Sequence, residues 1–229
     1  MQDHSTIYTD GALRNRGHRK RLTDILDAVR EHIGTGATSY ADYGCSNGYI
    51  TERVASIVRP ERAKGFDYRE DLIESARSAR AGIDFDTIDL NAPLAVSEKA
   101  QFVTCFETLE HLGHLDTAAE NICSAIEPGG RALVSVPIEI GPIGIAKYLV
   151  KVGVFRYSLD TLEPMRFRRL KYLGALLRGS RISAFRGDRS DWASHFGFDY
   201  RDLDDLFASS GLLDEAWNKG TSRFYLLSR

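Results

Sequence analysis

The heptapeptide FETLEHL, residues 106–112, places two carboxylates and one imidazole within five positions of one another. If the segment is helical, Glu107, Glu110 and His111 share one side of the helix, because residues three and four apart are neighbours there. Carboxylate and imidazole groups bind divalent metal ions, and a histidine also acts as a general base. A solvated helix face would show the same spacing. The segment alone therefore leaves three interpretations open: a metal site, a metal-free active site or a surface helix.

A glycine-rich loop stands earlier in the chain, in DYGCSNG at residues 42–48. It lies between a predicted strand and a predicted helix, the layout in which backbone approaches a nucleotide-like ligand closely. Two further carboxylates, Asp67 in GFD and Asp89 in DTIDL, end the next two predicted strands. We expect all three carboxylates at the carboxyl edge of one sheet, where open α/β folds bind ligands. Helix capping or turn formation remains an alternative role for Asp67 and Asp89.

The elements that must position these residues alternate between strand and helix. TLEHLGHLDTAAENICSAI, residues 108–126, predicts one continuous helix, and LLDEAWN with SRFYLLS predicts a closing hairpin. This alternation predicts an α/β fold with a doubly wound, mostly parallel sheet that helices cover on both faces. The other predicted strands cover residues 39–43, 63–67, 83–89, 101–106 and 129–137.

The composition is that of an ordinary globular protein. The 229 residues are 43% hydrophobic and 27% charged, with a formal net charge of −2, which argues against a dedicated nucleic-acid binder. The three cysteines include no C-x-x-C pair, which fits a reducing compartment. Neither a signal peptide nor a membrane span is indicated, so we expect a cytoplasmic protein.

Three parts of the chain are expected. They are an N-terminal basic helical segment (1–36), a core (37–136 and 196–229) and an inserted, mainly helical substrate lid (137–195).

The inserted lid is predicted to be basic, with eleven Lys and Arg residues and five acidic residues. Within it, MRFRRLKYLGALLRGSRI predicts an amphipathic helix with Leu170, Leu173 and Leu177 on one side. Such a helix could cover the active site, lie on an anionic membrane or bind phosphate groups.

The motifs together resemble class I S-adenosylmethionine-dependent methyltransferases. DYGCSNG, GFD, the DL at Asp89, FVTCFETLEHL and IEPGGRALVSVP follow one another as that family's motifs do. The resemblance implies a seven-stranded Rossmann-like sheet, S-adenosylmethionine as the cofactor and methyltransferase activity. Two departures, Ser46 where glycine is usual and Gln101 where an acidic residue is common, do not touch the expected chemistry.

The resemblance also implies which residues bind the cofactor. Asp42, Gly44 and Gly48 would lie beside the methionine part, and Asp67 would hold the ribose. Asp89 and Leu90 would lie against the adenine, and Phe106 would sit near the sulfonium. Ser46 and Tyr68 are also expected to bind the cofactor.

The Glu-x-x-Glu-His run followed by a later histidine is similar to two metal-dependent groups. These are the 2′-O-methyltransferases of small-RNA 3′ ends and the O-methyltransferases of ubiquinone biosynthesis. The resemblance implies that Mg²⁺ or Mn²⁺ would be bound by Glu107, Glu110, His111 and His195. Many family members with Leu-Glu-His lack a metal, so a metal-free mechanism stays open. Catalytic residues are expected among His111, His195 and Glu107.

The expected reaction is methyl transfer to a hydroxyl of a small-molecule, glycan or lipid-linked acceptor. An anionic membrane or phosphate group is a further expected contact of residues 137–195, whereas nucleic acid is not expected as a partner. The alternatives are an RNA 3′-terminal ribose 2′-O-methyltransferase and a catalytically silent module that binds the cofactor.

Overall fold

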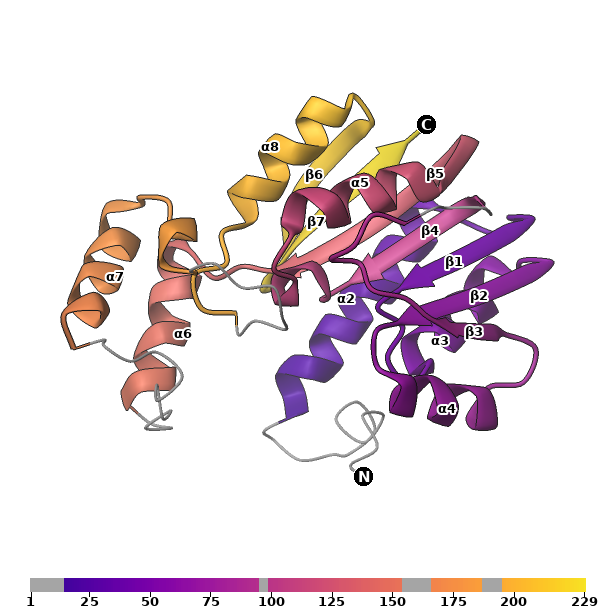
Figure 1. Ribbon diagram of the computed structural model, residues 1–229, viewed down its shortest axis with the longest axis horizontal. Helices are drawn as coiled ribbons and strands as arrows, with labels where there is room; N and C mark the ends of the chain where they lie inside the picture. The colour runs from indigo at the N-terminus through magenta and orange to yellow at the C-terminus, as the bar shows by residue number, and fades with distance from the viewer. Residues whose placement is uncertain (1–14, 95–98, 154–165, 187–194) are drawn as a thin grey trace.

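A seven-stranded sheet forms the centre of the protein (Figure 1). The computed structural model describes residues 15–94, 99–153, 166–186 and 195–229. The strand order is β3-β2-β1-β4-β5-β7-β6, with parallel pairing from β3 to β5 and antiparallel pairing of β7 with β5 and β6. The predicted α/β class, mostly parallel sheet and closing hairpin are thereby confirmed. The strands are β1 (Ser39–Tyr43), β2 (Arg62–Asp67), β3 (Asp84–Thr87), β4 (Ala100–Phe106), β5 (Ile126–Pro137), β6 (Leu213–Lys219) and β7 (Ser222–Ser228).

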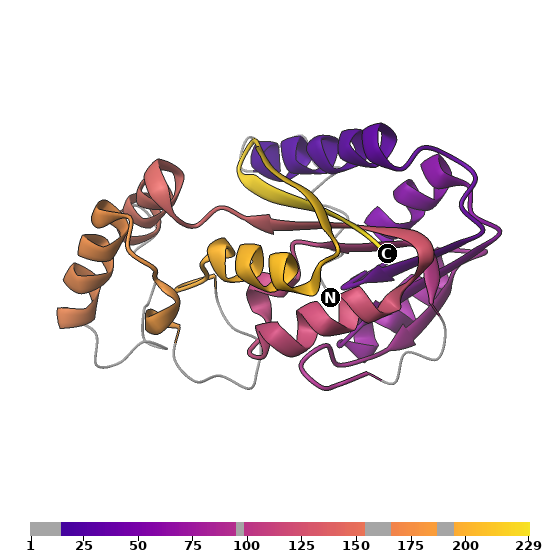
Figure 2. The same cartoon turned by 90° about the horizontal axis from the view of Figure 1, so that it is seen from above.

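Helices cover both faces of the sheet, as Figure 2 shows from above. Helices α2 (Arg16–His32) and α3 (Tyr49–Val58) lie on one face, and α5 (Leu115–Ala125) and α8 (Tyr200–Ser210) lie on the other. Each face has its own apolar core, because the central strands of a parallel sheet bury side chains on both sides. Helix α4 (Glu70–Ala79) packs through Ile73 and Ala76 against Phe85 of β3.

The predicted continuous helix over residues 108–126 is wrong. A short 3₁₀-helix, η2 (Leu109–His111), is followed by a break, and α5 begins at Leu115. Asn91 stabilises the break, because its Oδ1 accepts hydrogen bonds from the backbone N–H groups of Gly113 and His114 at 2.8 and 3.1 Å. A side-chain oxygen that satisfies two backbone donors offers the chain an alternative to helical hydrogen bonds.

The inserted segment contributes two helices that extend beyond the sheet, at the left of Figure 1. Helices α6 (Gly141–Gly153) and α7 (Arg166–Arg178) pack on each other around Tyr172, Ala175 and Leu176, and η4 (Ser183–Phe185) follows. Leu170 and Leu177 of α7 are 73% and 65% exposed, so they face solvent beside basic residues. Residues 154–165 and 187–194 of the predicted lid lie outside the described residues.

Within the described ranges, none of the helices combines the length and apolar composition that crossing a bilayer requires.

Candidate active site

A cavity of about 530 Å³ lies at the carboxyl ends of β1, β2 and β4. Strand β1 has β2 on one side and β4 on the other, so the order in which strands are added to the sheet reverses at β1. Open α/β sheets bind ligands at such a point. Leu90 lines a smaller cavity that shares several residues with the first. Gly48 and Asp89, which were also predicted to bind the cofactor, are not among the described residues that line either cavity. The predicted residues that line the large cavity are Asp42, Gly44, Ser46, Asp67, Tyr68, Phe106, Glu107 and His111.

The loop after β1 is folded onto Asp67. The Ser46 backbone N–H donates to Asp67 Oδ2 at 2.8 Å, and the Arg69 N–H donates to Oδ1 at 3.0 Å. Ser46 has a φ of 51°, so this serine adopts the left-handed conformation that the more usual glycine would adopt without strain. Burial raises the pKa of Asp67, and the hydrogen bonds from the Arg69 and Ser46 backbones oppose that rise.

Asp89 instead forms a local turn. Its Oδ1 accepts hydrogen bonds from the backbone N–H and side-chain amide of Asn91 at 2.9 and 3.1 Å. This arrangement matches the alternative role that the sequence left open for Asp89, because Asp side chains commonly bond backbone two residues on.

Gly44 is required by its surroundings. Its φ is 86°, and a Cβ atom there would meet Thr108 Oγ1 at 2.1 Å. Gly44→Ala is therefore expected to destabilise the fold by about 2 kcal/mol or more and to weaken S-adenosylhomocysteine binding. Gly129→Ala is the matched control, because Gly129 has a φ of 79° with nothing within 4 Å of its added Cβ. Thermal unfolding and calorimetric titration test this, and equal losses in both variants would contradict it.

Asp42 is a buried carboxylate held by two hydroxyls. Thr51 Oγ1 donates to Oδ2 and Thr104 Oγ1 to Oδ1, both at 2.6 Å, and the Tyr40 hydroxyl lies 2.9 Å from Thr104 Oγ1. Burial raises the pKa of Asp42 to about 6, against the lowering effect of the Thr104 and Thr51 hydrogen bonds. Asp42 thus links β1, α3 and β4 at the wall of the cavity.

Asp42→Asn is expected to change the pH dependence of stability. Since the pKa rises from 3.8 to about 6 on folding, the folded protein holds a proton that the unfolded chain has lost in this window. The free energy of unfolding therefore falls as pH rises from about 4 to 6, by up to about 3 kcal/mol. The neutral amide of the Asp42→Asn variant does not titrate, so the variant does not lose this stability as pH rises. The variant should therefore be more stable than wild type at pH 7 and as stable as wild type near pH 4. Denaturant unfolding across this range tests it, and parallel curves would contradict it.

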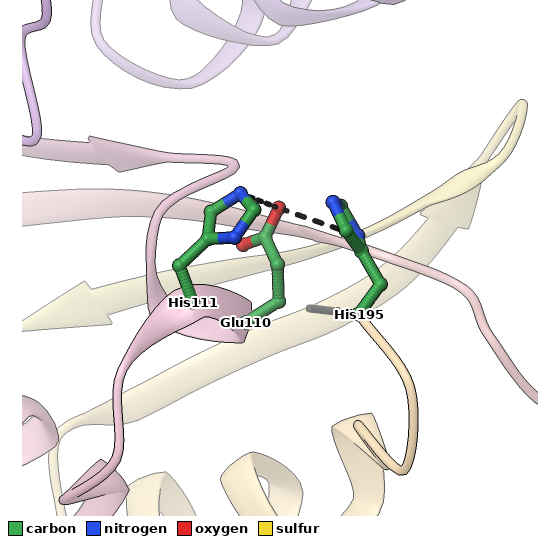
Figure 3. Close-up of side chains that lie close together, drawn as sticks. All are labelled: Glu110, His111 and His195. Atoms are coloured by element: carbon green, nitrogen blue, oxygen red, sulfur yellow. Dashed lines mark ion pairs between the residues drawn. The ribbon is translucent and has the colours of Figure 1, made fainter. Parts of the chain in front are cut away.

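Three of the predicted metal ligands converge (Figure 3), and one of them, His111, also lines the large cavity. Their ligand atoms all lie within 4.8 Å of one another. Glu110 Oε1 is 3.7 Å from His111 Nε2 and 4.0 Å from His195 Nδ1, and the two imidazole rings meet edge to face with centroids 4.6 Å apart. His195 arrives from the segment before α8, some 85 positions after Glu110.

The chemistry of this group fits a divalent cation. Glu110 is fully buried, and neither of its carboxylate oxygens accepts a hydrogen bond from another residue in the described part of the chain. Burial, followed by the charge of Glu107, raises the pKa of Glu110 well above its usual range. Buried carboxylates are normally hydrogen-bonded or paired with a cation, and a carboxylate with two imidazoles is a ligand set for Mn²⁺ and related metals.

Glu107 does not belong to this group. It follows β4 with a φ of 50°, so it lies outside the helix that would have aligned it with Glu110 and His111. Its Oε1 accepts hydrogen bonds from the hydroxyls of Ser135 and Ser222, both at 3.0 Å, and its Oε2 lies 2.9 Å from Arg21 Nη1 of α2. The structure therefore corrects the expectation that the three polar groups of FETLEHL face a single point.

Glu139 is a site residue that the sequence interpretation missed. It lies just after β5, is 7% exposed, and places Oε1 3.7 Å from His195 Nδ1 and 3.0 Å from Lys147 Nζ. Arg186 was missed as well, and its guanidinium donates to the backbone carbonyls of Glu110 and Leu112 at 2.6 Å, which fixes η2. The available signal for Glu139 was a carboxylate directly after a parallel strand, the same signal that identified Asp67.

The comparisons with known proteins identify the family. A family model described as a methyltransferase domain matches residues 14–203, and the chain belongs to that family. An S-adenosylhomocysteine-bound magnesium protoporphyrin IX methyltransferase from Synechocystis PCC 6803 shares the fold with a TM-score of 0.58 and 16% identity, over 97% of this chain and 91% of that one. The methyltransferase domain of a bacterial CtHen1 shares it with a TM-score of 0.56 and 14% identity, over 93% and 100% of the two chains.

Among curated proteins, the ubiquinone biosynthesis O-methyltransferase of Stutzerimonas stutzeri is 29% identical over 147 residues, 58% of this chain. The match spans 62% of that relative's length, so this chain corresponds to about three fifths of it. The chain therefore carries a methyltransferase domain and has the fold of these solved methyltransferases.

Proposed function

We propose that the protein transfers the methyl group of S-adenosylmethionine to a hydroxyl oxygen with the help of a divalent cation, Mg²⁺ or Mn²⁺. The acceptor is a small-molecule, glycan or lipid-linked hydroxyl compound. One observation supports this proposal above the others. The buried Glu110 carboxylate, which accepts no hydrogen bond from another described residue, lies close to His111 and His195, and His111 lines the cavity. The similarity to an O-methyltransferase of ubiquinone biosynthesis supports the same reaction class.

We assign different residues to binding the cofactor and to binding the cation. The glycine loop and Asp67 would hold the cofactor, with Asp67 accepting hydrogen bonds from the ribose hydroxyls and Phe106, which lines the cavity, near the sulfonium. Glu110, His111 and His195 would hold the cation, which would supply the charge that lowers the pKa of the acceptor hydroxyl. His111 lines the cavity as well as joining this group, so it would help to place the acceptor oxygen near the cofactor's methyl group.

The matched acceptors catechol and resorcinol test this proposal. Adjacent hydroxyls can chelate one cation, whereas the hydroxyls of resorcinol are too far apart to do so. With S-adenosylmethionine labelled with ¹³C at the methyl group, we expect O-methylated catechol, loss of product after EDTA treatment, and recovery on addition of Mn²⁺. Transfer that ignores the chelator, or a label found on nitrogen, would contradict the proposal.

We also propose that the lid contacts an anionic membrane surface. Leu170 and Leu177 are exposed on α7 beside the exposed Arg169, Lys171 and Arg178, a combination typical of helices that lie at a lipid interface. Vesicles of phosphatidylglycerol should retain the protein in a sedimentation assay, whereas vesicles of phosphatidylcholine should not. Replacing both leucines with serine should lower the retained fraction severalfold. Equal retention by both lipids would contradict this proposal.

A further inference from the structure

Glu139 and Glu110 face the same histidine. His195 Nδ1 lies 4.0 Å from Glu110 Oε1 and 3.7 Å from Glu139 Oε1. Neighbouring ligand atoms around one six-coordinate ion at about 2.1 Å stand about 3 Å apart. Both separations are within 1 Å of that value. Glu139 lies outside the group whose ligand atoms are all within 4.8 Å of one another, so its side chain would have to move to place all three atoms around one ion.

Lys147 already supplies a positive charge to Glu139. Its Nζ donates to Glu139 Oε1 at 3.0 Å and to the Ile138 carbonyl oxygen at 2.9 Å. Helix α6 can bring Lys147 this close because Gly144 packs on the Glu139 backbone, where an added Cβ would meet the carbonyl oxygen at 2.1 Å. The ammonium group of Lys147 thus neutralises a carboxylate that is 7% exposed.

Glu107 is held elsewhere on both oxygens. Ser135 and Ser222 donate to Oε1, and Arg21 pairs with Oε2. These contacts come from β5, β7 and α2, so joining the group would cost Glu107 two hydrogen bonds and an ion pair at once. Moving Glu139 toward the group would require release from Lys147, a side chain on a helix that extends beyond the sheet.

On the basis of the proposed function, we propose that Glu139, and not Glu107, is the fourth protein ligand of the cation held by Glu110, His111 and His195. In the absence of the cation, Lys147 forms an ion pair with the Glu139 carboxylate. The lysine is therefore a competitor of the metal, and its removal should favour metal binding. The lid helix α6 is then linked to the state of the metal site through this one side chain.

The test measures Mn²⁺ binding to the full chain in the presence of S-adenosylhomocysteine. Electron paramagnetic resonance detects the free ion, so its signal falls as Mn²⁺ binds. Glu139→Gln is expected to weaken Mn²⁺ binding about tenfold or more, whereas Glu107→Gln should change it by about twofold or less. Lys147→Met should tighten it. The reverse order, with Glu107→Gln weakening binding and Glu139→Gln leaving it unchanged, would overturn the inference.

Two further readouts keep the test decisive. S-adenosylhomocysteine affinity should be unchanged in Glu139→Gln and Lys147→Met, because neither residue lines the cofactor cavity. If Glu139→Gln does not fold, Lys147→Met decides, since weakened or unchanged Mn²⁺ binding there would overturn the inference. Wild-type protein that binds no Mn²⁺ would refute the proposed metal-assisted function and this inference together. Wild-type binding that survives Glu139→Gln would refute this inference alone.

Discussion

Glu110→Gln is expected to abolish Mn²⁺ binding and to lower kcat/KM for catechol by roughly 10²- to 10³-fold. The loss corresponds to about 3–4 kcal/mol of transition-state stabilisation, the several kcal/mol that a Lewis acid at a reacting oxygen supplies. Glutamine keeps the size of the side chain and removes the negative charge. Initial rates at saturating S-adenosylmethionine, with and without added Mn²⁺, measure the effect.

The same variant should be more stable than wild type when both are free of metal. Burial raises the pKa of Glu110, so the ionised carboxylate destabilises the folded state, and a neutral amide removes that cost. Addition of Mn²⁺ should raise the melting temperature of wild type and leave that of Glu110→Gln unchanged. Glu120→Gln, at an exposed position on α5, is the control and should behave as wild type. A Glu110→Gln enzyme that keeps its rate and its response to Mn²⁺ would contradict the assignment.

Asp67→Ala is expected to weaken S-adenosylhomocysteine binding by about 3–6 kcal/mol, roughly 10²- to 10⁴-fold. Two hydrogen bonds from ribose hydroxyls to a charged acceptor account for this range, at about 1.5–3 kcal/mol each. Loss of the acceptor for the Ser46 and Arg69 backbones adds to the effect, because the glycine loop is tied to this carboxylate. Isothermal titration calorimetry measures the affinity directly.

Asp86→Ala provides the matched control for this variant. Asp86 is a carboxylate on the neighbouring strand β3, about half exposed and paired with Lys64 at the surface. Surface ion pairs of this kind contribute little, so its removal should leave affinity and stability nearly unchanged. An equal loss of affinity in both variants would show that Asp67 acts through general charge and not as a ribose ligand.

The fold could be predicted from local patterns. Alternating apolar strands and helical repeats, each followed by a turn, define a parallel sheet and the edge at which its ligand residues gather. Asp42, Gly44 and Asp67 line the cavity because each stands directly at the end of a strand or in the loop after it. The placement of these residues depends on their own neighbours in the chain.

The group of Glu110, His111 and His195 was only partly predictable, because it depends on contacts between distant segments. His111 and His195 meet beside Glu110, as expected from their types, but the spacing Glu-x-x-Glu-His was interpreted as helical. Tertiary contacts determine three features that the hydrophobic periodicity of the sequence does not predict. These are the left-handed conformation of Glu107, its pairing with Arg21 and the break at Asn91. Glu139 was missed although it follows a parallel strand, and its contact with Lys147 of the inserted segment could not be predicted from the sequence pattern.

The most direct test of the proposed metal-assisted mechanism is anomalous X-ray diffraction at the manganese edge from crystals grown with S-adenosylhomocysteine and Mn²⁺. We predict one anomalous peak within bonding distance of Glu110, His111 and His195, about 2.0–2.3 Å from each ligand atom. A fully occupied S-adenosylhomocysteine site with no peak among these three side chains would contradict the mechanism.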